Sequence, residues 1–247
     1  MYSSDEEYFA DIAKAYQTEL EILYKAGLRN AQVDDPNLAC KSADHEWSEY
    51  TQTDRLTTDF CDEKMLTGWA ADKRNKQTAD EQFDAYIKFY NDCFKRPSDM
   101  HLGIHLCRGN FVNSRHFSEG AYDRIAQKLF QNLNVGTYYL EYDTPRAGGF
   151  EPLKYLPKNK NVILGVVTSK FPDLENHKEM VERVYKAADF VAEGSGQTRQ
   201  EALQRLGVSP QCGFASHSDG NLLGHDDMVK KLKLVRGIAD EVWPGQP

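Results

Sequence analysis

The chain has 247 residues, of which 40% are hydrophobic and 28% charged, so it is long enough to bury the core of one large α/β domain. A formal net charge of -8 argues against a nucleic-acid-binding protein, because neutralising phosphates requires a basic surface. The acidic first residues, and the absence of any run of about eighteen apolar residues, argue against a signal peptide and a membrane helix. We therefore expect one soluble, cytoplasmic domain over residues 1–247 that acts on small molecules.

The first elements of the chain are predicted to be a helix and a short strand. Apolar residues recur at helical spacing over residues 9–26, and Gly27 is a typical helix stop. The strand predicted over residues 28–33 then runs into Asp34 and Asp35. Two carboxylates therefore follow the first predicted strand directly.

Residues 37–100 contain no convincing strand pattern. The segments 54–73 and 78–94 have helical spacing, and the second opens with a capping box formed by Thr78 and Glu81. This stretch is therefore predicted to be a mainly helical crossover or insertion within the domain.

From residue 101 the chain alternates between strand and helix. The predicted strands cover residues 101–107, 137–142, 161–167 and 208–214, and the predicted helices cover 118–133, 176–193, 199–207 and 225–243. Alternation of this kind predicts parallel strands covered by helices, about five strands in all. A (β/α)8 barrel needs eight strands and an open sheet needs fewer, so the pattern alone does not choose between these two folds.

Side chains that can bind a metal lie at the ends of the predicted strands. His105 and Cys107 are two residues apart, so they point to the same side of their strand at its carboxyl end. Cys212 lies in the last predicted strand, and acidic residues follow two others. Imidazole, thiolate and carboxylate are the ligands of tetrahedral zinc. Because the five cysteines of the chain suggest no disulfide framework, these thiols are available to a metal.

The alternative is that the same residues belong to the hydrophobic core. Free cysteine is among the most buried residue types, and a buried histidine is commonly hydrogen-bonded within the protein. A lone H-x-C spacing is a weak metal signal compared with paired C-x-x-C motifs. On the residues alone, both interpretations stay open.

Five sequence blocks resemble, in this order, the catalytic barrel of the cobalamin-independent methionine synthase family, within the wider group that includes uroporphyrinogen decarboxylase-like barrels. The blocks are QVDDP, HLCRGNF, YYLEYDTPRAGGFEPL, VILGVVTSK and VSPQCGFAS. The resemblance is greatest to the single-domain branch of the family. In that family the acidic strand end belongs to the fourth barrel strand, so the resemblance implies a (β/α)8 (TIM) barrel that lacks its first three strands in this chain.

The resemblance also implies a metal site, a substrate site and a reaction. The family's zinc ligands fall on His105, Cys107, Glu141 and Cys212. The acidic strand end that binds the amino group of the substrate falls on Asp34, with Asp35 in place of the more usual glutamate. The implied reaction is that of a 5-methyltetrahydropteroyltriglutamate–homocysteine S-methyltransferase, in which zinc, Zn2+, activates the thiol of homocysteine toward a methylated folate. Coordination by zinc deprotonates a thiol at neutral pH.

One departure from the family pattern concerns the proton donor. Where the family carries DIHSP, this chain has TSKFP, so Lys170 occupies or neighbours the position of a histidine that handles the proton of the leaving nitrogen. Lys170 is the candidate catalytic residue on this basis. A lysine there also resembles relatives with another acceptor thiol, such as the alkyltransferases that open epoxides with coenzyme M.

Three hypotheses about function follow from these observations. The first is zinc-dependent methyl transfer from a methylated folate to homocysteine, and the second is zinc-dependent alkylation of another thiol or from another donor. The third is a truncated, non-catalytic barrel subunit, because an unclosed barrel exposes two strand edges. Under the third hypothesis we expect self-association or a partner chain that completes the barrel.

Overall fold

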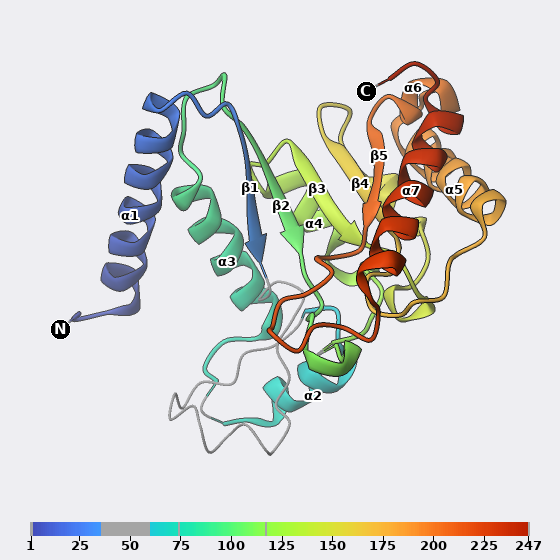
Figure 1. The fold of residues 1–247 in the computed structure, drawn as a ribbon. Coiled ribbons are helices and arrows are strands. Elements are labelled where there is room, and N and C mark those ends of the chain that lie inside the picture. Colours follow the sequence, from blue (N-terminus) through green and yellow to red (C-terminus); the bar gives the residue numbers. More distant parts are fainter. Residues whose placement is uncertain (1, 36–59, 74, 117, 247) are drawn as a thin grey trace.

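The computed structural model describes residues 2–35, 60–73, 75–116 and 118–246. Within these residues, five parallel strands form the central sheet, in the same order as in the chain. They are β1 (Asn30–Asp35), β2 (His101–Leu106), β3 (Thr137–Glu141), β4 (Asn161–Val167) and β5 (Leu206–Pro210). The predicted α/β class with five parallel strands is confirmed, and Figure 1 shows the strands side by side.

Seven α-helices occur in the described part of the chain. They are α1 (Asp5–Lys25), α2 (Glu63–Ala71), α3 (Ala79–Cys93), α4 (Asp123–Asn132), α5 (His177–Ser195), α6 (Arg199–Leu203) and α7 (His225–Val242). Figure 1 shows α3 and then α1 on the β1 side of the sheet, and α6 and α7 beside β5, with α5 next to α6 and α7. None of these helices combines the length and the apolar character needed to cross a membrane.

The two faces of the sheet differ in polarity, because successive side chains of a strand point to opposite faces. One face is apolar and belongs to the main core; its buried side chains include Leu102, Ile104, Leu106, Tyr138, Leu140, Val162 and Leu164. On the other face Asp34 is in register with His105, and His105 with Tyr139. The face opposite the core therefore presents polar side chains from neighbouring strands.

The two helix starts that the sequence marks with a threonine and, three residues later, a glutamate both form capping boxes. Thr78 accepts a hydrogen bond from the backbone N–H of Glu81 at 3.2 Å, and Thr198 accepts one from Glu201 at the same distance. In each pair the glutamate in turn accepts a hydrogen bond from the backbone N–H of the threonine. The sequence signal for the starts of α3 and α6 is therefore confirmed.

The predicted helical stretch over residues 37–100 is described over residues 60–73 and 75–100, and these residues contain α2 and α3 and no strand. Residues 36–59 lie outside the described residues. In the described part of the segment 54–73, α2 begins at Glu63, because Asp62 caps it by accepting hydrogen bonds from the N–H groups of Lys64 and Met65. The assignment of residues 1–247 to a single domain stays a prediction.

Several element boundaries differ from the sequence expectations: the last strand, for example, ends at Pro210, so Cys212 follows it instead of lying within it. Two of the differences have a clear local cause. The helix predicted from residue 118 begins at Asp123, because Gly120 has a φ of 142° and its N–H binds the carbonyl of Arg146. A β-carbon at Gly120 would lie 1.9 Å from the carbonyl oxygen of Cys61, so the close approach requires glycine. The last strand begins at Leu206 rather than at residue 208, because Leu206 already pairs with β4.

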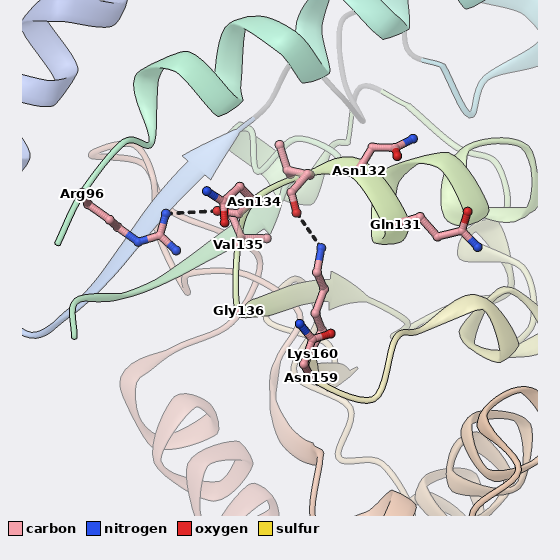
Figure 2. Close-up of a pocket in the computed structure, with 9 residues that line it drawn as sticks. Arg96, Gln131, Asn132, Asn134, Val135, Gly136, Asn159 and Lys160 are labelled. Carbon is pink, nitrogen blue, oxygen red and sulfur yellow. Dashed lines mark hydrogen bonds between the residues drawn. The ribbon is translucent and has the colours of Figure 1, made fainter. Parts of the chain in front are cut away.

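A cavity of about 380 Å³ lies at the amino-terminal edge of the sheet, away from the strand ends that carry the candidate ligands. Figure 2 shows Lys160 and Arg96 reaching the segment 132–136 from different parts of the chain. The Lys160 ammonium group donates hydrogen bonds to the carbonyls of Phe130 and Leu133 and to the hydroxyl of Tyr138. Lys160 is 8% exposed, and burial lowers its pKa to about 8.

The buried Lys160 predicts a pH dependence of stability. The folded-state pKa of about 8 is below the reference value of 10.5, so between these values the unfolded chain binds more protons than the folded one. The free energy of unfolding should therefore rise with pH in this window, by up to about 3 kcal/mol relative to a Lys160→Met variant. Urea unfolding of both proteins across the window measures this difference, and a difference independent of pH would contradict the prediction.

Candidate metal centre

Four side chains that can bind a metal meet at the carboxyl ends of three strands. His105 is near the end of β2, Cys107 follows it by two residues, Glu141 ends β3, and Cys212 follows β5. One ligand atom from each residue lies within 4.8 Å of those of the other three. The alternation of side chains along β2 explains why His105 and Cys107 share one side. The structure therefore brings together all four residues to which the family resemblance assigned the metal.

The spacing of the four ligand atoms suits a small tetrahedral ion. The Sγ atoms of Cys107 and Cys212 are 3.8 Å apart, and His105 Nε2 is 4.0 Å from Glu141 Oε1. Two sulfur ligands of a tetrahedral zinc ion, each about 2.3 Å from the metal, are about 3.8 Å apart. Two thiolates, an imidazole and a carboxylate are also ligand types typical of zinc, whereas magnesium and calcium bind mainly oxygen ligands.

His105 is oriented so that its second ring nitrogen faces the other ligands. Its Nδ1 lies 3.2 Å from the carbonyl oxygen of Tyr139, and this contact favours the tautomer in which Nδ1–H donates. Nε2 then carries the lone pair. Among the described residues this buried Nε2 has no hydrogen-bond partner. A buried imidazole nitrogen without a partner is costly, and a metal ion would satisfy it.

The two thiols interact with each other. Cys107 is hydrogen-bonded to Cys212, and this bond together with burial raises the pKa of the Cys107 thiol well above its usual range. The same hydrogen bond lowers the pKa of Cys212. The pair therefore shares one proton more readily than it loses two, as expected for strongly coupled groups. The backbone N–H of Gly109 also donates to Cys107 Sγ, at 3.3 Å.

Glu141 is fully buried and held on both carboxylate oxygens. Oε1 accepts a hydrogen bond of 2.9 Å from the backbone N–H of Arg108, and Oε2 accepts one of 2.8 Å from Arg146. Arg146 also binds Asp143 at 3.1 Å. Burial raises the pKa of Glu141, while the positive charge of Arg146 and the Arg108 N–H oppose this rise. Arg146 thus supplies one positive charge to a buried pair of carboxylates beside the site.

A glycine allows the Cys212 loop to approach the sheet. Gly165 in β4 is in register with Glu141, and a β-carbon on it would lie 2.7 Å from Cα of Gln211. Gln211 directly precedes Cys212, so a larger residue at position 165 would push this loop away from the other ligands. Ser169 adds a second tie, because its N–H donates to the Gln211 side chain at 2.5 Å.

The two aspartates predicted to bind substrate lie on opposite faces of β1, as alternation along a strand requires. Asp34 is exposed, is in register with His105, and accepts a hydrogen bond of 2.8 Å from Gln32. Asp35 is 2% exposed and is hydrogen-bonded to Tyr90, whose pKa is raised by burial and by the charge of Asp35. The structure thus brings Asp34, but not Asp35, to the face of the ligands. Substrate binding by either residue stays a prediction.

Lys170 is buried above the same edge of the sheet, with 1% of its surface exposed. Its ammonium group donates to the carbonyls of Gly109 and Arg115 and to the Asn110 side chain. Its predicted role as a proton donor stays a prediction. Sequence reasoning missed Asn110 and the carbonyl of Tyr139, because a backbone acceptor carries no residue signature and asparagine is common in loops.

Comparison with known proteins gives relatives that are longer than this chain. Two Bacillus subtilis (strain 168) proteins, the uncharacterised YxjH and YxjG, are each 35% identical over 245 residues, which cover 98% of this chain and 56% of the relative. No protein-family model matches the chain. The chain therefore spans a little over half the length of the curated relatives it matches.

Two solved structures share the fold. One is a Listeria monocytogenes protein assigned provisionally as a vitamin-B12-independent methionine synthase, with a TM-score of 0.57 and 24% identity over 96% of this chain and 56% of that chain. The other is a B12-independent methionine synthase from Shewanella sp. W3-18-1 in complex with selenomethionine, with a TM-score of 0.63 and 18% identity over 98% of this chain and 56% of that chain. At these identities the likeness shows the fold, and it matches the predicted partial barrel.

Proposed function

We propose that this chain belongs to the cobalamin-independent methionine synthase family and takes part in zinc-dependent transfer of a methyl group from a methylated folate to the thiol of homocysteine. The observation that carries the proposal is the convergence of His105, Cys107, Glu141 and Cys212, whose ligand atoms lie within 4.8 Å of one another. The shared fold with methionine synthases supports the same reaction class.

The residues of the chain have distinct roles in this proposal. His105, Cys107, Glu141 and Cys212 would hold the zinc ion. A free thiol with a pKa near 8.5 is mostly protonated at neutral pH. A bound zinc ion would deprotonate the thiol and so make it a nucleophile. Asp34, exposed on the face of the ligands, offers a carboxylate to the amino group of the amino-acid substrate. In the overall reaction the methyl group moves from nitrogen to sulfur, and the folate nitrogen takes up one proton.

A second candidate function is alkylation of a different thiol, or from a different donor. The observation that favours it is Lys170, which stands in TSKFP where the family carries a histidine, and which is buried among oxygen acceptors. The four candidate ligands would serve this reaction in the same way, because the activated group is again a thiol.

The experiment uses the purified chain loaded with zinc, a methyl-labelled folate triglutamate, and a panel of thiols that includes homocysteine and coenzyme M. Labelled methionine that appears only with homocysteine supports the proposal, and label on another thiol supports the second candidate. Cys212→Ser, which removes one ligand, should lose the activity. A zinc-loaded chain that transfers label to no thiol would overturn methyl transfer from folate to any thiol of the panel, and would leave alkylation from another donor and the non-catalytic subunit.

A further inference from the structure

Three loops meet above the candidate metal centre, and Lys170 joins two of them. The loops follow β2, β4 and β5, and the first and last of them carry Cys107 and Cys212. Lys170, in the loop after β4, donates to the carbonyl of Gly109 at 2.9 Å and to that of Arg115 at 3.2 Å. Both acceptors belong to the loop of Cys107.

Asn110 connects this arrangement to the loop of Cys212. Its Oδ1 accepts from Lys170 at 3.2 Å, and its Nδ2 donates to the carbonyl of Gly213 at 2.7 Å and to the hydroxyl of Ser216 at 2.9 Å. Gly213 directly follows Cys212. The ammonium group is therefore connected to the residue that follows Cys212 through one side chain and two hydrogen bonds.

Further hydrogen bonds connect the loop after β4 to the loops after β2 and β5. The hydroxyl of Ser169 donates to the carbonyl of Gly213 at 2.8 Å, and Asn221 donates both to Asn110 at 2.8 Å and to the carbonyl of Ser169 at 3.0 Å. Ser114 donates to the carbonyl of Lys170. An ammonium group has three N–H donors, and each of those of Lys170 has an acceptor within the protein.

We infer that Lys170 is a positioning residue, which holds the loops of Cys107 and Cys212 in mutual register so that the two sulfur atoms lie at ligand distance before metal or substrate arrives. This inference rests on the proposed function for the metal that the thiols bind. It does not depend on proton transfer by Lys170, whose donors are all directed at loop oxygens. Without the ammonium group, buried oxygen acceptors in the loop of Cys107 would lose their donor, and the loop would shift to reach water.

The effect should appear in metal affinity, because residues that orient metal ligands typically contribute about 10–100-fold. The matched control is Lys160, a second buried lysine with three oxygen acceptors, which lies at the opposite end of the sheet. Lys170→Met and Lys160→Met both remove a buried ammonium group and its hydrogen bonds. Only the first variant removes hydrogen bonds that hold the loop of Cys107 and the side chain of Asn110, which in turn binds the loop of Cys212.

Two readouts test the inference on the full chain. One is zinc affinity by competition with a chelator, and the other is the rate of alkylation of Cys107 and Cys212 in the metal-free protein, assigned by peptide mass. We expect Lys170→Met to bind zinc about 10–100-fold more weakly than Lys160→Met and its two cysteines to react faster. Equal zinc affinities and equal alkylation rates in these two variants would overturn the inference.

A second variant keeps the test decisive if Lys170→Met does not fold. Asn110→Ala cuts the connection to Gly213 and Ser216 but leaves Lys170 its two carbonyl acceptors, and we expect it to weaken zinc binding and speed alkylation in the same direction. A parent protein that binds no zinc would contradict the proposed function. The alkylation rates of the metal-free variants would still decide whether Lys170 positions the thiols.

Discussion

Cys107→Ser and Cys212→Ser should each lower the affinity for zinc by more than about 100-fold, whereas the parent chain should hold about one zinc ion. The reason is that each substitution removes one of two thiolates whose sulfur atoms lie 3.8 Å apart, and losing a ligand should cost more than the 10–100-fold typical of the residues behind a ligand. The measurement is zinc per chain by elemental analysis after dialysis, together with affinity by chelator competition.

Cys93→Ala is the matched control for these two variants. Cys93 is 1% exposed and lies at the end of α3, and burial raises the pKa of its thiol to about 11, so it should contribute packing but no metal ligand. The control should retain its zinc. If Cys93→Ala loses zinc as completely as the two ligand variants do, the loss reflects general destabilisation and the assignment of the ligands is wrong.

Arg146→Met should destabilise the metal-free protein by about 3–5 kcal/mol, the cost typical of breaking a buried ion pair on one side. Arg146 lies between two carboxylates whose side chains are fully buried, those of Glu141 and Asp143, and its removal leaves both without their cation. Burial raises the pKa of Glu141, and the positive charge of Arg146 limits this rise, so the pKa should rise further in the variant. The measurement is the free energy of unfolding by urea for both proteins.

The loss in Arg146→Met should also depend on pH, with a defined sign. A carboxyl group whose folded-state pKa is raised favours the folded state below its unfolded pKa, and this contribution is lost as pH rises through the folded pKa. The deficit of Arg146→Met relative to the parent should therefore shrink as the pH falls and Glu141 takes up a proton. Arg199→Met, which breaks an exposed pair with Asp189, should show a much smaller loss. Equal losses in the two variants would refute the argument.

Much of the candidate site could be predicted from local sequence rules. His105 and Cys107 share a face because side chains alternate along a strand, and Glu141 joins them because neighbouring parallel strands end at the same edge. Capping boxes likewise fix the starts of α3 and α6 without tertiary information. These features depend on spacing along the chain, which a sequence displays directly.

Other parts of the site depend on contacts that no local rule contains. Cys212 reaches the site from a loop, and its position depends on the close approach of Gln211 to Gly165. The same alternation that predicts the His105–Cys107 pair separates Asp34 from Asp35, so two adjacent acidic residues cannot both face the ligands. The role of Lys170 also depends on contacts distant in the sequence, because its three hydrogen-bond acceptors belong to a loop about sixty residues earlier in the chain.

X-ray absorption at the zinc K-edge of the zinc-loaded parent chain tests the central claim most directly, because it reports the atoms bound to the metal. The four converging side chains predict two sulfur ligands at about 2.3 Å and two nitrogen or oxygen ligands at about 2.0–2.2 Å. A spectrum without sulfur ligands, or a folded chain that takes up no zinc, would contradict the assignment of His105, Cys107, Glu141 and Cys212 as one metal centre.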